Sequence, residues 1–181
     1  MAASNSTVRA AIPDDAAGCT AIYRPYVENT AISFEVEVPT VAEMAARIAA
    51  ARASHEWLVA ADAAGRIVGY AYAHAFNPRA AYQWSAETSI YIDDSQHRSG
   101  AGRALYTQLL RRLSDRGYRR AFAGITQPNH ASNAFHRSFG FRDAGLYRRV
   151  GWKHDSWHDV AWMQLDLTPA ADQDRPPTPI S

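Results

Sequence analysis

The sequence predicts an α/β domain with a mixed, largely antiparallel central sheet flanked by helices. Strand-like and helix-like periodicities alternate along most of the chain. Pairs of strands that could form hairpins are expected near both ends, at 57–76 and 146–167. The 181 residues are 47% hydrophobic, enough to bury one core of ordinary size. We expect one domain over residues 8–167, between a flexible N-terminus at 1–7 and a Pro-rich, flexible tail at 168–181.

Composition and charge exclude several classes of function. Lysine and arginine total 19 and aspartate and glutamate total 18, so a net charge of +1 offers no basic surface for nucleic acid or membranes. Cys19 is the only cysteine, which excludes an intramolecular disulfide and a cysteine metal cluster. No apolar run approaches the length of a membrane span, and residues 1–7 lack the pattern of a signal peptide. The expected location is the cytoplasm.

Turn and cap signals order the first half of the chain. Pro25 interrupts a helical pattern and predicts a break or kink near Arg24. Thr40 and Glu43 form a capping box at the start of the next helix. Gly65 suits the turn between two strands. The expected elements are, in order, a strand at 8–12, a helix after Pro13, a loop or short strand at 29–39, a helix at 41–52, and strands at 57–61 and 67–76.

The rest of the chain is organised around a strand, a turn and a helix at 84–116. Polar and apolar side chains alternate over 85–92, which predicts a strand with two different faces. A turn with Gly100 and Gly102 follows, and leucines at helical spacing predict a helix that ends at Gly117. The later expected elements are a strand at 119–126, a helix at 131–139, and a hairpin of strands at 146–150 and 160–167.

The glycine turn suits an anionic ligand. The first N–H groups of a helix have no partner within the helix, and the helix dipole is positive there. Gly100 and Gly102 remove Cβ atoms that would keep a ligand away, and Arg98 and Arg103 add positive charge. The alternative is an ordinary helix start with two convenient glycines. The turn is not a P-loop, since no Gly-Lys-Ser/Thr follows, and it lacks the third glycine of a dinucleotide fingerprint.

Several separate blocks of the sequence resemble one family. The segment at 97–102, HRSGAG, is similar to the Gln/Arg-x-x-Gly-x-Gly/Ala pyrophosphate loop of the GNAT superfamily of acetyl-CoA-dependent N-acetyltransferases. Within that superfamily, the chain resembles the phosphinothricin acetyltransferases from about Val8 to about Leu167. It departs from their pattern at His97, where Gln or Arg is usual, and at Asn77, where they carry a lysine. The other similar blocks are AYQWSAETSIYI, GRALYTQLL, PNHAS, FHRSFGF and VGWKHDSWHDVAWMQLDL.

This resemblance implies a GNAT-like acyl-CoA N-acyltransferase fold and acetyl-CoA as co-substrate, with no metal. The 90–92 backbone would pair with the pantetheine arm as with an added strand. Asn129 would contact the same arm, although without the resemblance a simple N-cap is the better interpretation. The residues expected to hold acetyl-CoA are Ile90, Tyr91, Ile92, Arg98, Ser99, Gly100, Ala101, Gly102, Arg103, Asn129 and Ser132.

Acetyl transfer to an amine requires that the amine lose its proton, and two catalytic residues are expected. By resemblance, Glu87 is the general base, whereas a glutamate in a strand would otherwise be read as a surface residue. His136 is the second candidate for acid–base work, and packing between Phe135 and Phe139 is an equally good interpretation. A tyrosine such as Tyr106 or Tyr91 could protonate the leaving thiolate.

The acceptor is expected to be a small acidic amino acid, most simply phosphinothricin or demethylphosphinothricin. Arg79 and Tyr82 would anchor its anionic groups, because arginine pairs with carboxylate or phosphinate in a fork geometry. The resemblance places Phe34 on a loop beside the acceptor. Asn77 in place of the lysine lowers the local positive charge, which leaves methionine sulfoximine, methionine sulfone or another amino-acid metabolite as alternatives. A structural salt bridge is the simpler role for Arg79.

The C-terminal hairpin is rich in aromatic residues, and Trp152, Trp157 and Trp162 together with the resemblance predict a homodimer. The histidines and aspartates of KHDSWHDV, at 153–160, do not predict a metal site, since no other ligand cluster supports one. Two other functions stay open: an N-acetyltransferase acting on proteins, and a non-catalytic CoA-binding module. The presence of Glu87 together with the glycine turn argues against the second.

Overall fold

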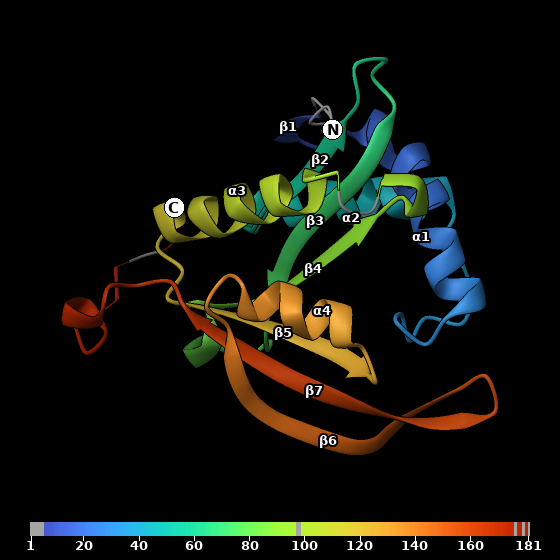
Figure 1. Cartoon of the computed structure of the whole chain (residues 1–181). Helices are drawn as coiled ribbons and strands as arrows, with labels where there is room; N and C mark the ends of the chain where they lie inside the picture. Colours follow the sequence, from blue (N-terminus) through green and yellow to red (C-terminus); the bar gives the residue numbers. More distant parts are fainter. Residues whose placement is uncertain (1–5, 97–98, 176, 179, 181) are drawn as a thin grey trace.

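The computed structural model describes residues 6–96, 99–175, 177–178 and 180. It forms a seven-stranded sheet in the order β1-β2-β3-β4-β5-β7-β6, with helices on both faces (Figure 1). Only β4 and β5 pair in parallel among the described strands. The mixed, largely antiparallel α/β fold expected from the sequence is therefore confirmed. The strands are β1 Thr7–Ala10, β2 Trp57–Ala61, β3 Ile67–Ala75, β4 Ser85–Ile92, β5 Arg120–Gln127, β6 Arg142–Lys153 and β7 Ser156–Asp166.

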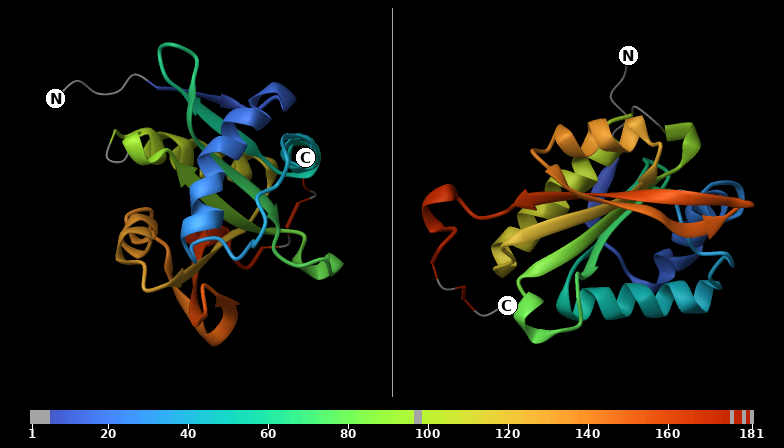
Figure 2. Two further views of the ribbon diagram at one scale, coloured as in Figure 1. Left: turned by 90° about the vertical axis from the view of Figure 1, so that its right-hand side faces the viewer. Right: turned by 90° about the horizontal axis from the view of Figure 1, so that it is seen from below.

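Helices cover both faces of the sheet (Figure 2). One face carries α1 and α2, which bury Cys19, Met44 and Ile48 against aromatic residues of β2 and β3. The other face carries α3 and α4, whose leucines and aromatic residues form the larger core with Val68 and Ala71. The helices are α1 Ala16–Asn29, α2 Val41–Ser54, α3 Ala101–Arg116 and α4 His130–Arg137, and short 3₁₀ helices lie at Pro13–Asp15, Ala80–Tyr82, Asp94–Gln96 and Ala170–Asp172.

The expected break in the first helix is wrong, because α1 continues through Pro25 to Asn29. A proline inside a helix costs roughly 3 kcal/mol through a lost hydrogen bond and a steric clash. Tyr23 and Val27 lie on either side of it and are almost completely buried, at 4% and 1% exposed. Their packing against the sheet favours one continuous helix despite that cost. The capping box before α2 is confirmed, since Thr40 and Glu43 exchange hydrogen bonds between side chain and backbone.

The described part of the C-terminal tail lies against the domain. The Trp84 indole Nε1–H donates to the carbonyl of Thr178, 2.7 Å away. Arg119 donates to the carbonyl of Asp172 at 3.0 Å, and Ile180 packs against the core on the α3 face. These contacts fit a segment that follows the surface of the domain near the start of β4.

Candidate active site

The central strand β4 and its neighbour β5 separate along their length (Figure 1). On one side β4 pairs with β3 over residues 86–92, from Ala75↔Ala86 to Gly69↔Ile92. On the other side it pairs with β5 only from Ser85↔Arg120 to Glu87↔Phe122. Beyond Glu87 the strands diverge, so the β5-facing backbone groups of 88–92 have no sheet partner among the described residues. This fork leaves an edge of β4 that an extended ligand could pair with.

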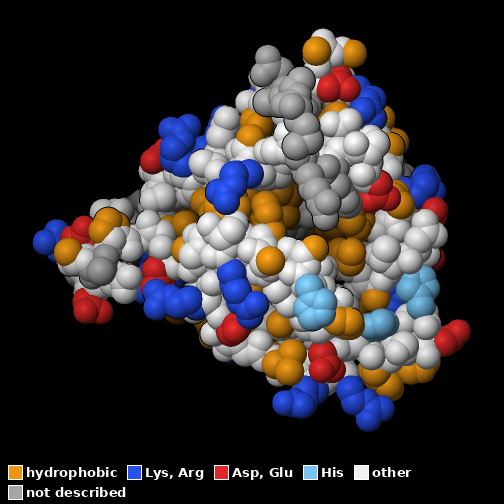
Figure 3. Space-filling view, in the orientation of Figure 1, with side chains coloured by type: hydrophobic (Ala, Val, Ile, Leu, Met, Phe, Trp, Pro, Cys, Tyr) orange, Lys and Arg blue, Asp and Glu red, His pale blue; other side chains and the backbone are white. Residues whose placement is uncertain are grey.

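A cleft occupies the open part of the fork. Its walls are residues 88–91 of β4 and 123–126 of β5. Ile32, in the loop between α1 and α2, closes one side, and α4 supplies Ser132 and His136. In the space-filling view, hydrophobic side chains gather in the hollow between α3 and α4 (Figure 3). Predicted cofactor residues from β4 and α4 therefore meet in one cleft.

The glycine turn leads into α3 as the sequence predicts. Gly100 has a φ of 91°, a left-handed conformation that favours glycine. The first helical hydrogen bond runs from Ala104 N–H to Gly100 C=O, which leaves the preceding amides free of helical partners. A Cβ on Gly102 would meet Ile92 at 3.6 Å, an ordinary contact, so only Gly100 needs its glycine for backbone reasons. Arg98 and His97 lie outside the described residues.

The remaining predicted acetyl-CoA residues take distinct positions. The Ser99 hydroxyl accepts from the Ala101 amide at 3.3 Å and stiffens the turn. Arg103 is exposed and lies over the ring of Phe139, 5.1 Å from its centroid, which directs it toward α4. Asn129 caps α4 by accepting from Ser132 N–H at 3.0 Å, and it also lines the cleft. The cap and a place in the cleft are thus compatible.

Glu87 lies at the apex of the fork. It is the last β4 residue paired with β5, and on the other side of β4 it pairs with His74 of β3. The side chain is half-buried, and no group in the described residues donates a hydrogen bond to its carboxylate. Burial raises the pKa of Glu87, and the positive charge of His74 opposes that rise. A carboxylate with a raised pKa and free oxygens can accept a proton from a bound amine.

His136 and Tyr106 pack together on the face of the sheet that α3 and α4 cover. The His136 Nδ1–H donates to the carbonyl of Ser132 at 2.8 Å, which leaves Nε2 as the acceptor nitrogen, and Nε2 is buried without a partner in the described residues. Burial lowers the pKa of His136. Tyr106 is fully buried and burial raises its pKa. Its hydroxyl donates to Thr88 Oγ1 at 2.8 Å, because the Thr88 proton goes to the carbonyl of Phe122 at 3.0 Å.

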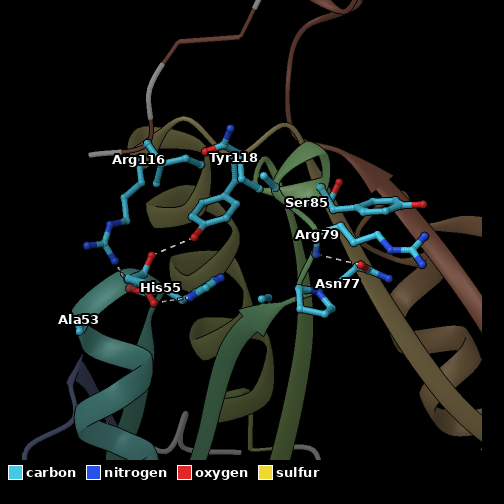
Figure 4. A pocket seen from close by; sticks show the side chains of 14 residues that line it. Ala53, His55, Asn77, Arg79, Ser85, Arg116 and Tyr118 are labelled. Carbon is cyan, nitrogen blue, oxygen red and sulfur yellow. Dashed lines mark hydrogen bonds between the residues drawn. The ribbon is translucent and has the colours of Figure 1, made fainter.

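Two predicted acceptor residues line a second cavity of about 420 Å³, at the connection from β3 to β4. Arg79 and Tyr82 line it together with His55 and Arg116. Figure 4 shows the Arg79 side chain extending away from His55 and Arg116. Asn77 Oδ1 accepts from the backbone N–H of Arg79 at 3.1 Å, so it shapes this turn.

Phe34 lies elsewhere, in the loop between α1 and α2. It is 39% exposed, and its ring packs on Gly151 of β6 and faces His158 of β7, with 6.2 Å between ring centroids. The described residues do not bring Phe34 into one cavity with Arg79 and Tyr82. Its neighbour Ile32 reaches the cleft of the fork instead.

Three residues with structural roles escape reasoning from sequence. Thr88 is a polar residue on the apolar face of its strand, a signal that could have indicated a buried hydrogen bond. Lys153 is the only lysine in the chain, and it is buried. Ile32 gives no signal in the sequence. Within the described ranges there is no group of three metal-binding side chains, and no helix there is long and apolar enough to cross a membrane.

Comparison with known proteins identifies the family. An acetyltransferase (GNAT) domain matches residues 8–162. A phosphinothricin N-acetyltransferase from Streptomyces viridochromogenes is 33% identical over 96% of this chain and 92% of its own length. An L-methionine sulfoximine/L-methionine sulfone acetyltransferase from Pseudomonas paraeruginosa is 36% identical over 91% of this chain and 96% of its own length.

A solved structure shares the whole architecture. The phosphinothricin acetyltransferase from Sinorhizobium meliloti, solved in complex with acetyl-CoA, superposes with a TM-score of 0.89 and 37% identity. The match covers 96% of this chain and 93% of that one. The structural match and the family match both cover most of the sequence. The chain therefore belongs to the GNAT family and is an acetyl-CoA-dependent N-acetyltransferase.

Proposed function

We propose that the enzyme acetylates the amino group of a small acidic amino acid by direct attack of the amine on acetyl-CoA. The observation that carries this proposal is the position of Glu87 at the apex of the fork between β4 and β5, as a half-buried carboxylate to which no described residue donates a hydrogen bond. A proton acceptor at this apex would stand close to an acetyl group held in the fork.

Acetyl-CoA supplies the activated acetyl group, and the residues present fit its shape and charge. The edge of β4 that β5 leaves without a sheet partner would pair with the pantetheine arm, with Asn129 and Ser132 across the cleft. At its far end the carbonyl of Ile92 already accepts from the Tyr26 hydroxyl at 2.6 Å. The amides at the start of α3 and the guanidinium groups of Arg98 and Arg103 would hold the pyrophosphate. The left-handed Gly100 lets the chain turn into the helix there.

Glu87 is proposed to take the amine proton, directly or through water. An α-amino group is mostly protonated at neutral pH, since even the peptide terminus titrates at about 8. The raised pKa of Glu87 brings its basicity closer to that of the amine, which favours proton transfer. His136 is proposed to be structural, because its accepting nitrogen is buried among aromatic rings.

The acceptor is proposed to be phosphinothricin, demethylphosphinothricin, methionine sulfoximine or methionine sulfone. Relatives at similar identity are named for the first and the last two, so identity does not choose among them. Arg79 and Tyr82 would read the anionic end in the cavity beside the start of β4. Acetylation would neutralise the amine of such a toxic amino acid, which would make the enzyme a resistance factor acting in the cytoplasm.

A substrate panel tests this proposal. CoA release would be measured with phosphinothricin, methionine sulfoximine, methionine sulfone, common amino acids, peptides and no acceptor. We expect acceptor-dependent release with at least one of the first three and none above background with peptides. Release with peptides alone would indicate a protein acetyltransferase. Acetyl-CoA binding without release for any amine would indicate a non-catalytic module.

We also propose that the enzyme is a homodimer joined through the hairpin of β6 and β7. Five large apolar side chains there are 45–57% exposed, more than isolated surface residues usually present together. They are Leu146, Tyr147, Val150, Trp152 and Trp157. A second copy of this chain would bury them at the edge of the sheet. Sedimentation at micromolar concentration should give twice the mass of one chain, and Trp157→Ser should shift it toward the monomer; a wild-type monomer would contradict the proposal.

A further inference from the structure

The only lysine of the chain is buried where two segments meet. The other basic residues that make up the total of 19 are all arginines. Lys153, at the end of β6, is 7% exposed, and its Nζ donates to the carbonyls of Val27 at 2.6 Å and Ser33 at 2.7 Å. Val27 belongs to the last turn of α1, where the helix dipole is negative. A compact ammonium fits between two carbonyls, whereas the planar fork of arginine would not.

The loop that Lys153 contacts is held at one residue. Ser33 is 4% exposed, its hydroxyl bonds the Tyr23 hydroxyl at 2.6 Å, and it accepts from Glu35 N–H at 3.1 Å. With the Lys153 contact, both its side chain and its carbonyl are fixed. A second bond joins the same segments, since His154 Nε2 lies 3.3 Å from the carbonyl of Thr30.

The residues beside Ser33 are the ones that reach functional surfaces. Ile32 and Phe34 are 45% and 39% exposed on either side of the buried serine. Ile32 forms a wall of the cleft between β4 and β5. Phe34 packs on β6 so tightly that a Cβ on Gly151 would lie 2.2 Å from its ring. Fixing Ser33 therefore fixes both neighbours relative to β6 and to the cleft.

We propose that Lys153 is a positioning residue that holds the loop between α1 and α2 in its closed place, as a wall of the acetyl-CoA cleft. The inference rests on the proposed use of that cleft. Lys153 touches no reacting atom and acts through Ser33 and Ile32. When the loop leaves this position, Ile32 no longer forms the wall of the cleft. If acetyl-CoA binds only to protein with the loop in place, its apparent affinity falls in proportion to the fraction of protein in that state.

Kinetics separate this role from a purely structural one. Lys153→Met keeps the apolar stem and removes the donor, and Gly151→Ala displaces Phe34. Both should raise the KM for acetyl-CoA about tenfold and leave kcat at saturation within threefold. Gly145→Ala in the same strand is the matched control, since a Cβ there meets no atom within 4 Å, and it should behave as wild type. Unchanged KM in folded Lys153→Met and Gly151→Ala would overturn the proposal.

A labelling experiment on the wild-type protein does not depend on any variant folding. Because the chain has one lysine, mass spectrometry after treatment with N-hydroxysuccinimidyl acetate carrying deuterium reads Lys153 alone among side-chain amines. Lys153 should react far more slowly than a lysine peptide, and saturating acetyl-CoA should slow it at least fivefold further. The proposal would be overturned if Lys153 were labelled at the rate of the peptide, or if acetyl-CoA bound to the protein without slowing the labelling of Lys153. An enzyme that acetylates no amine yet shows this protection would refute the proposed function and keep this inference.

Discussion

The two flanks of β4 differ although they belong to one strand. Toward β3 the ladder continues from Ala86 to Ile92, and toward β5 it ends at Glu87. The β3 flank is part of the rigid sheet and carries His74 opposite Glu87. The β5 flank leaves backbone groups available to a ligand. A binding edge can thus form inside a sheet, without an exposed outer strand, when one ladder stops early.

A buried hydrogen-bond chain marks the point where the ladder stops. Tyr106 donates to Thr88, and Thr88 donates to the carbonyl of Phe122, the residue at the end of the parallel pairing. The threonine side chain thus satisfies a carbonyl where the β4 backbone leaves β5. The paired and unpaired parts of the β5 flank meet at this chain, so substitutions in either part and at this junction should have different effects.

The largest expected effect comes from the carboxylate at the apex. Glu87→Gln keeps the shape of the side chain but cannot accept the amine proton, so kcat should fall by about 10²–10⁴. Steady-state kinetics from pH 6 to 9 would measure it, and the loss should shrink as pH rises because more amine is already neutral. Acetyl-CoA binding by calorimetry should be unchanged. A fall confined to KM would make Glu87 a substrate-positioning residue, and full activity would remove it from the mechanism.

In the turn before α3, acetyl-CoA binding should depend more strongly on one of the two glycines than on the other. Gly100→Ala forces a side chain into the left-handed region, at a cost of roughly 1–2 kcal/mol, and should raise the KM for acetyl-CoA about tenfold. Gly102→Ala separates the two roles of the turn, because its Cβ makes only ordinary contacts within the protein and any rise in KM would come from crowding the ligand; we expect a smaller rise than for Gly100→Ala. Equal effects of the two changes would argue against the conformational role of Gly100.

The junction between the flanks should matter for stability. Thr88→Val removes the acceptor of a buried tyrosine hydroxyl and the donor to Phe122, so the free energy of unfolding should fall by about 1–3 kcal/mol. Thr126→Val, on the opposite wall of the cleft, should change it by less than about 0.5 kcal/mol. Urea denaturation would measure both. The effects of Thr88→Val and Tyr106→Phe should not add, and full additivity would contradict the chain.

Glu87 should also leave a signature in stability. Its pKa is raised in the folded protein above the ordinary value of 4.5, so the folded state binds the proton more tightly than the unfolded state does. The ionised carboxylate therefore destabilises the fold as pH rises through the raised pKa. Glu87→Gln should unfold at the same or a higher temperature than wild type at pH 7, and the difference should vanish below about pH 4.5. A lower melting temperature at pH 7 would contradict this account.

The smallest effect is expected at His136. If the ring is structural, His136→Gln should leave kcat within threefold and the pH profile unshifted, with some loss of stability from the changed packing. Activity and thermal melting of the same preparation would be compared. A hundredfold fall in kcat in a folded variant would indicate that His136 takes part in catalysis.

Much of this architecture follows from local sequence signals, and the parts that do not are long-range. The alternation in β4, the capping box at Thr40 and the left-handed Gly100 are each set within a few residues. The continuity of α1 through Pro25 depends on packing against distant strands. The contact from Lys153 to Ser33 spans 120 positions, so no local pattern could reveal it. Arg79, assigned to the acceptor from its chemistry and its position before Glu87, and Phe34, assigned to it by resemblance, lie at different surfaces that only the fold distinguishes.

The most direct test of the fork as the acetyl-CoA site is amide hydrogen exchange with and without acetyl-CoA, read along β4 and the two cavities. We predict new protection at 88–92 and at the start of α3, with no change at 77–83, which line the second cavity. Protection at 77–83 with none at 88–92 would place acetyl-CoA outside the fork and contradict the account.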